Sequence, residues 1–183
     1  VLPNPNNTQY VSSTPINIVT NDDINTVSAV AKKAMSSVVG ITTVEVQQLP
    51  FPFFSSQEVE GVGSGVIVDS NGYILTNSHV VADGKAKSVH VLFENGEKKP
   101  GTVLWNDSLL DLAIVKVDAT NLPVADLGDS DKLEVGEIVV AIGNPLGLEF
   151  QRTVTSGIIS GLHRSIRVSN NNVIEDLIQT DAS

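Results

Sequence analysis

A histidine follows a strand-like apolar run in the stretch Gly72-Tyr73-Ile74-Leu75-Thr76-Asn77-Ser78-His79-Val80-Val81. An aspartate precedes a second such run later in the chain, in Leu110-Asp111-Leu112-Ala113-Ile114-Val115. Acyl transfer at a peptide bond needs a hydroxyl activated by an imidazole, and a carboxylate that fixes the tautomer of that imidazole. We therefore predict His79 as a general base and Asp111 as its orienting carboxylate.

The order of these residues along the chain separates classes of hydrolase. Histidine before aspartate, with a serine still to come, is the order of chymotrypsin-type barrels and differs from that of subtilisins and α/β-hydrolases. No serine of the chain stands in a Gly-x-Ser-x-Gly string, and Ser64, which lies between two glycines, is not a candidate nucleophile. We expect the nucleophile beyond Ser183, in a Gly-Asn-Ser-Gly-Gly string.

Composition limits the classes of partner and chemistry. The 183 residues are 41% apolar, which is enough for a folded core. The net charge of −10, without a Lys/Arg cluster, argues against nucleic acid as a partner. The absence of cysteine excludes thiol chemistry and thiolate metal sites. No apolar run approaches the roughly 18 to 20 residues of a membrane-spanning helix.

The first two thirds of the chain combine an arm, a helix and short strands. Residues 1–20 are rich in Pro, Asn, Ser and Thr and are expected to form an N-terminal arm or linker. Helical spacing of apolar residues predicts a helix over 22–37, and residues 21–118 are expected to form the helix and a first β-barrel. The stretch 49–60 has no clear period and is predicted to be a surface loop. Runs rich in Val, Ile and Thr predict strands at 39–46, 65–69, 73–78, 88–93, 101–106 and 113–118.

A second module is expected after a linker. The linker is predicted at 119–132, where Pro123 and Gly128-Asp129-Ser130 favour turns. Residues 133–183 are expected to form a partial second barrel. Strands are predicted there at 138–142, 153–160 and 173–180.

The glycine-rich block at 61–65 is not a phosphate-binding loop, because a strand and the Asn71-Gly72 turn follow where a helix would have to begin. It is better explained as a barrel strand with close backbone packing.

This block is the first of several that follow one another in chain order: GVGSGVIV at 61–68, GYILTNSHVV at 72–81, DLAIVKV at 111–117, VVAIGNP at 139–145, TVTSGIIS at 153–160 and IQTDA at 178–182. Taken in this order, the blocks resemble the HtrA/DegP family of trypsin-like serine proteases.

The resemblance implies an all-β fold, a chymotrypsin/trypsin-like double β-barrel with an N-terminal helix, whose second barrel is incomplete in this chain. It also implies an ATP-independent serine endopeptidase of protein quality control, without cofactor or metal, that acts on unfolded or misfolded proteins. Members of the family are usually homotrimers, and their protease domain is generally followed by a PDZ domain. An extracytoplasmic location in a bacterium is expected, in the periplasm or tethered to the cell surface, with a signal or anchor upstream of Val1.

Regulation is a further implication of the resemblance. The segments 143–152 and 162–173 would be loops that switch the catalytic site, with Arg164 as a candidate relay; the alternative is an ordinary surface turn. The other two histidines, His90 and His163, are expected to face solvent, with His163 at a strand end.

The expected position of the serine has consequences for this polypeptide. Without the nucleophile and the oxyanion hole, residues 1–183 alone are predicted to be inactive. An incomplete barrel would expose a strand edge, which a companion C-terminal fragment could cover. The alternative function is a non-catalytic, protease-like module that binds extended or unfolded peptides at that edge. A small-molecule-binding barrel has little support in the sequence.

Overall fold

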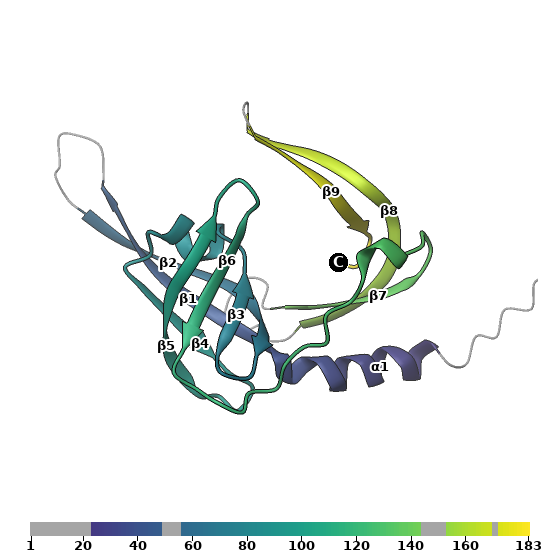
Figure 1. Ribbon diagram of the computed structural model, residues 1–183, viewed down its shortest axis with the longest axis horizontal. Coiled ribbons are helices and arrows are strands. Elements are labelled where there is room, and N and C mark those ends of the chain that lie inside the picture. Colours follow the sequence, from purple (N-terminus) through teal and green to yellow (C-terminus); the bar gives the residue numbers. More distant parts are fainter. Residues whose placement is uncertain (1–22, 49–55, 144–152, 170–171) are drawn as a thin grey trace, which may run out of the picture.

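The computed structural model describes residues 23–48, 56–143, 153–169 and 172–183, which form one helix followed by two bodies of antiparallel strands (Figure 1). The helix α1 spans Asp23–Ala34, and a single 3-10 turn, Met35–Ser37, leads from it into the first strand. The predicted helix over 22–37 is therefore confirmed within the described residues, with its last turn tightened.

The first body is a closed barrel of six antiparallel strands in the order β1-β2-β3-β6-β5-β4. Pairing of Ile41 with Val91 lies within the β1–β4 ladder that closes it. Closure leaves the barrel without a free strand edge. Its strands are β1 (Val38–Gln48), β2 (Ser56–Asp69), β3 (Tyr73–Thr76), β4 (Ser88–Leu92), β5 (Lys98–Asp107) and β6 (Leu112–Val117).

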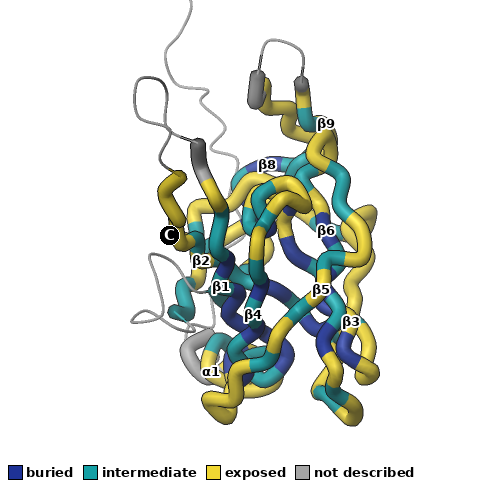
Figure 2. The backbone as a smooth tube through the Cα atoms, turned by 90° about the vertical axis from the view of Figure 1, so that its left-hand side faces the viewer, coloured by how far each residue is buried: buried dark blue, intermediate teal, exposed yellow. Residues whose placement is uncertain are grey.

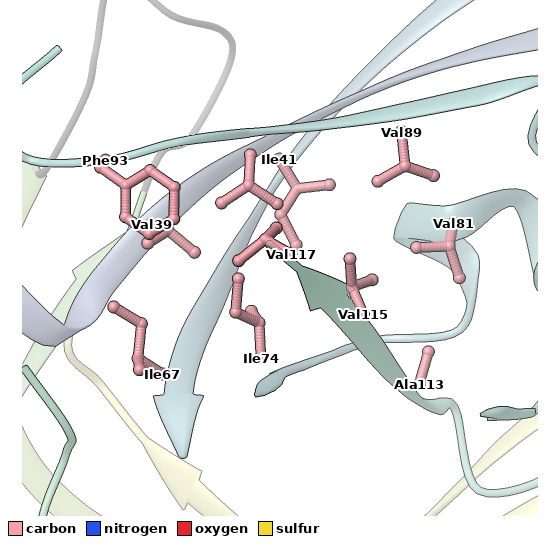
Figure 3. Close-up of a cluster of buried hydrophobic side chains, with 11 residues drawn as sticks. Val39, Ile41, Ile67, Ile74, Val81, Val89, Phe93, Ala113, Val115 and Val117 are labelled. Carbon is pink, nitrogen blue, oxygen red and sulfur yellow. The ribbon is translucent and has the colours of Figure 1, made fainter. Parts of the chain in front are cut away.

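The interior of this barrel is the hydrophobic core (Figures 2 and 3). Alternate residues of each strand point inward, as the period of two requires; Ala113, Val115 and Val117 on β6 are all buried. The rest of the buried cluster comes from the other strands and from the turns after β3 and β4: Val39, Ile41, Ile67, Ile74, Val81, Val89, Val91 and Phe93.

Glycines on β2 allow other chain segments to pack directly on its backbone. A Cβ added at Gly65 would lie 2.6 Å from Cγ2 of Ile74 and 2.9 Å from Cδ1 of Ile41. One added at Gly63 would lie 2.6 Å from both terminal methyl carbons of Val80. The interpretation of the glycine-rich block as a closely packed barrel strand is therefore confirmed.

The expected surface loop at 49–60 is wrong at its C-terminal end. Residues 56–60 belong to β2 and pair with 44–48 of β1, while 49–55 lie outside the described residues. This part of β2 is exposed on successive residues, because the ribbon extends beyond the barrel and neither of its faces is covered. Main-chain hydrogen bonds hold it, so the side chains carry no alternation for a sequence reading to detect.

The second body is a three-stranded antiparallel sheet in the order β7-β8-β9 (Figure 1). Its strands are β7 (Ile138–Gly143), β8 (Thr153–Ser169) and β9 (Asn172–Thr180). Among the side chains described in these strands, Ile159 is the one buried large apolar residue. The predicted all-β fold, with a complete first barrel and an incomplete second one, is confirmed.

The segment between β6 and β7 follows the surface of the barrel. The amide of Leu122 donates to the carbonyl of Ser70, and the amide of Ala125 donates to that of Ile67. Lys33 of α1 reaches this segment with an exposed ion pair to Asp126, at 2.5 Å. The boundaries proposed for the arm, barrels and linker remain predictions. In the part of the chain that the structure describes, no helix has the length and apolar character needed to cross a membrane.

Gly65→Ala is expected to destabilise the barrel by about 1–3 kcal/mol, because its methyl group would displace Ile74 and Ile41 in a filled core. Gly128→Ala is the matched control: an added Cβ there meets nothing within 4 Å. Its effect should be about zero or slightly stabilising. Urea unfolding of both variants measures the difference, and equal midpoints would contradict the close approach at Gly65.

Candidate active site

The predicted base lies directly after β3. His79 begins a short turn of 3-10 type, His79–Gly84, whose Val81 is fully buried in the core. Val80, the next residue after the histidine, packs against the Cα of Gly63 on β2. These two valines attach the turn to the barrel, so the histidine is presented at the rim while its neighbours are anchored.

The predicted carboxylate lies directly before β6. The side chain of Asp107 accepts hydrogen bonds from the amides of Leu109 and Leu110, at 2.9 and 3.0 Å, and so forms the turn that connects β5 to β6. Asp111 ends this turn in a left-handed conformation, with φ of 55°. Such a conformation is uncommon for a residue other than glycine, and aspartate is among those that tolerate it best.

The structure brings His79 and Asp111 together. Nδ1 of His79 lies 2.8 Å from Oδ2 and 3.0 Å from Oδ1 of Asp111, and the backbone amide of His79 donates to Oδ1 at 3.0 Å. Because an ionised carboxylate can only accept, Nδ1 must carry the hydrogen, and in the neutral imidazole Nε2 is then the unprotonated nitrogen. The side chain of His79 is 70% exposed. The arrangement thus offers a basic nitrogen to an incoming group.

Asn77 is a site residue that sequence reasoning missed. Its side-chain amide donates to the backbone carbonyl of Asp111 at 2.9 Å and to Oδ2 at 3.2 Å. It therefore holds both the main chain and the carboxylate of Asp111. Its place two residues before the histidine was the only available signal, since the contact spans 34 residues.

Hydrogen bonding also sets the ionisation of Asp111. Partial burial by itself raises the pKa of this carboxyl, but hydrogen bonds from the backbone and side chain of His79, together with one from Asn77, outweigh burial and hold the pKa below its ordinary value. The carboxyl is thus kept as an anion, the form that can stabilise a protonated imidazole.

The remaining histidines lie elsewhere. His90 is half-buried on β4, opposite Thr42 and Pro100, so only part of its ring faces solvent. His163 is exposed, as expected, but lies within β8 and not at a strand end. Its Nδ1 is 2.6 Å from Oδ1 of Asp176 on β9.

The expected loop at 162–173 is wrong over 162–169, which belong to β8, and over 172–173, which belong to β9. Arg164 pairs with Leu177 of β9 and is exposed, with its Nε above Gly161. Several register shifts interrupt this ladder, and each bulge breaks the alternation by which a strand is recognised. Residues 144–152 of the other expected loop lie outside the described residues.

Within the described ranges, no three His, Asp or Glu side chains gather as a metal ion would require.

A closed antiparallel barrel with a histidine after one strand and a hydrogen-bonded aspartate before its neighbour has the order and geometry of a chymotrypsin-type peptidase. A family model described as a trypsin-like peptidase domain matches residues 63–183. The chain belongs to this family of trypsin-like peptidases.

Individual relatives narrow the family to its HtrA/DegP group, as the sequence blocks predicted. The chain is 48% identical, over 68% of its length, to HhoB of Synechocystis sp., named as a serine protease. It is 45% and 41% identical to proteins named as DegP-like periplasmic serine endoproteases from Chlamydia pneumoniae and Buchnera aphidicola, over 74% and 85% of its length. It spans 29%, 27% and 37% of the length of these three relatives.

Solved structures agree with this grouping. The HtrA-type protease AlgW with a tripeptide superposes with a TM-score of 0.71 at 35% identity, over 85% of this chain and 46% of that one. AlgW with a decapeptide gives a TM-score of 0.69 at 33% identity, over 85% of this chain and 51% of that one.

Asp111→Asn is expected to remove a pH-dependent part of the stability. The folded carboxyl binds its proton more weakly than the unfolded one, so its contribution is complete above the unfolded pKa of about 3.9 and is lost as pH falls through the lower folded pKa. Urea unfolding of the unsubstituted protein and of Asp111→Asn from pH 7 to pH 3 measures the free energy of unfolding of each. The difference between the two free energies should narrow below about pH 4. A difference that widens on acidification would contradict the lowered pKa of Asp111.

Proposed function

We propose that this chain supplies the general base and its orienting carboxylate to a serine endopeptidase of the HtrA/DegP type. The observation that carries the proposal is the His79–Asp111 pair, with Nδ1 2.8 Å from Oδ2 and the ring exposed. Nε2 of His79 takes the proton of a serine hydroxyl as that oxygen attacks the peptide carbonyl, and then returns it to the leaving amine. Asp111 stabilises the imidazolium between these steps. The serine is proposed to come from sequence that follows Ser183.

Unfolded or misfolded proteins are the proposed substrates. A ring that is 70% exposed at the barrel rim suits an extended polypeptide better than a small molecule, which would need an enclosing cavity. The peptide complexes of AlgW and the endoprotease names of the DegP-like relatives support the same class of substrate.

The location and assembly of the protein are also proposals. Relatives named as periplasmic proteases support an extracytoplasmic location. A homotrimer rests on the family resemblance alone. A proposed companion C-terminal fragment that completes the second barrel is supported by the described side chains of β7, β8 and β9, among which Ile159 is the one large apolar residue that is buried.

Arg164 is proposed as a regulatory relay. The support is the resemblance to the HtrA/DegP family, together with the exposed place of Arg164 on β8. Substitution of Arg164 would then change the activation of the peptidase and leave the rate of its chemical step unchanged.

His79→Ala and Asp111→Asn are expected to abolish casein hydrolysis by the full-length protein, each with a loss of about 10⁴-fold in kcat, since the first removes the base and the second its anionic orienter. His90→Ala is the matched control, because His90 lies on β4 outside the site. It should retain activity. Turnover of unfolded casein with fluorescent labels measures all three variants.

The same assay tests the alternative, a non-catalytic module that binds extended peptides. Undiminished turnover in His79→Ala would contradict the assignment of the base. A full-length protein that binds unfolded casein but cleaves none, with or without His79, would support the binding module and overturn the proposed peptidase.

A further inference from the structure

We infer that Ser78 and Asp83 are positioning residues: the hydrogen bond between them fixes the loop that carries His79, and so sets the orientation of the proposed base. The inference rests on the proposed function. It adds residues that do not touch a substrate and that act through His79. The segment 78–84 is named the histidine loop below.

Three consecutive side chains, those of residues 77–79, bond to two different partners. Asn77 and His79 both reach Asp111. Ser78, between them, turns away from Asp111 and is fully buried; its hydroxyl donates to Oδ1 of Asp83 at 3.0 Å. A buried hydroxyl is retained where its hydrogen bond matters, because the group is costly to desolvate.

A second bond between the same two residues closes the loop. The amide of Asp83 donates to the carbonyl of Ser78 at 2.9 Å. Ala82 and Asp83 both adopt left-handed conformations, with φ of 52° and 51°, and these bring the amide of Asp83 to the carbonyl of Ser78. Such conformations persist only where surrounding contacts impose them, and they collect at functional sites. The two Ser78–Asp83 hydrogen bonds are among the contacts that hold this shape.

The loop is also connected to the segment that delivers Asp111. The side-chain amide of Asn106 donates to Oγ of Ser78 at 3.4 Å, and its Oδ1 lies against the backbone of Gly84. The next residue, Asp107, forms the turn that leads to Asp111. The end of β5 therefore braces both members of the proposed pair.

Exposure of the ring makes this bracing necessary. The imidazole is 70% exposed, so packing contributes little to its orientation, which depends on the hydrogen bonds to Asp111 and on the backbone of the histidine loop. A displacement of about 1 Å at a reacting group can cost about 10²-fold in rate. Loss of the Ser78–Asp83 bond should therefore lower kcat more than it lowers stability.

The first test is Ser78→Ala against Ser37→Ala in the full-length protein. Ser37 is also buried, and its hydroxyl donates to the carbonyl of Ala34 at 2.7 Å, so its hydrogen bond involves neither the histidine loop nor Asp111. Both variants should lower the melting temperature by similar amounts. Only Ser78→Ala should reduce kcat for a peptide substrate, by about tenfold or more, with KM changed less than twofold.

The second test separates the hydrogen bond from the backbone conformation. Asp83→Asn keeps an oxygen acceptor and tolerates positive φ, whereas Asp83→Gly tolerates positive φ but has no acceptor. Asp83→Asn should retain kcat within about threefold, and Asp83→Gly should lose about tenfold or more. Asp83 is exposed, so these variants remain informative if Ser78→Ala fails to fold.

The outcomes separate this inference from the proposed function. If His79→Ala abolishes turnover while Ser78→Ala behaves like Ser37→Ala, or Asp83→Gly like Asp83→Asn, the positioning role is overturned and the peptidase assignment stands. If His79→Ala leaves turnover intact, the proposed function fails, and the positioning role fails with it.

Discussion

The ladder between β3 and β6 is the constraint on which the proposed site depends. Thr76 at the end of β3 pairs with Ala113 near the start of β6, so the residues just outside this pair meet at the barrel rim. His79 follows on one side and Asp111 precedes on the other, which brings an imidazole and a carboxylate within 2.8 Å. A register slip of one residue would turn Ala113 and Val115 out of the core. The core therefore enforces the geometry of the site.

The two bodies of the chain contribute unequally to this constraint. The closed barrel buries apolar side chains from its strands and turns, whereas the described part of the β7-β8-β9 sheet buries little beyond Ile159. Local opening costs most where buried apolar contacts are dense. The proposed base and carboxylate thus lie on the body with the denser described core, and the contacts between them involve no residue of the second sheet.

Sequence reasoning succeeded where side chains report directly on the backbone. Runs rich in Val, Ile and Thr identified β3 and β6, and the chain order of His79 and Asp111 predicted the class of fold. It failed where main-chain hydrogen bonds form a strand without a regular alternation of side chains. Residues 56–60 of β2 lie in a ribbon that is exposed on both faces. Residues 162–169 of β8 lie in a ladder that bulges interrupt. The role of Asn77 was also out of reach, because its partner is distant in sequence and is chosen by the β3–β6 register.

The exposure of His79 and Asp111 explains why hydrogen bonds to backbone atoms accompany the contact between their side chains. An ion pair between exposed groups is weak in water and does not repay the entropy of ordering two side chains. Here the imidazole is 70% exposed and the Asp111 side chain 29%. Four hydrogen bonds from Asn77 and His79 nevertheless hold Asp111, and two of them involve backbone atoms. Backbone groups lose less freedom when they bond, because the barrel and the turns have already fixed them. The orientation of the proposed base is thus set by its hydrogen bonds to Asp111 together with the main chain of residues 77–79, so contacts that fix this main chain also act on the orientation of the ring.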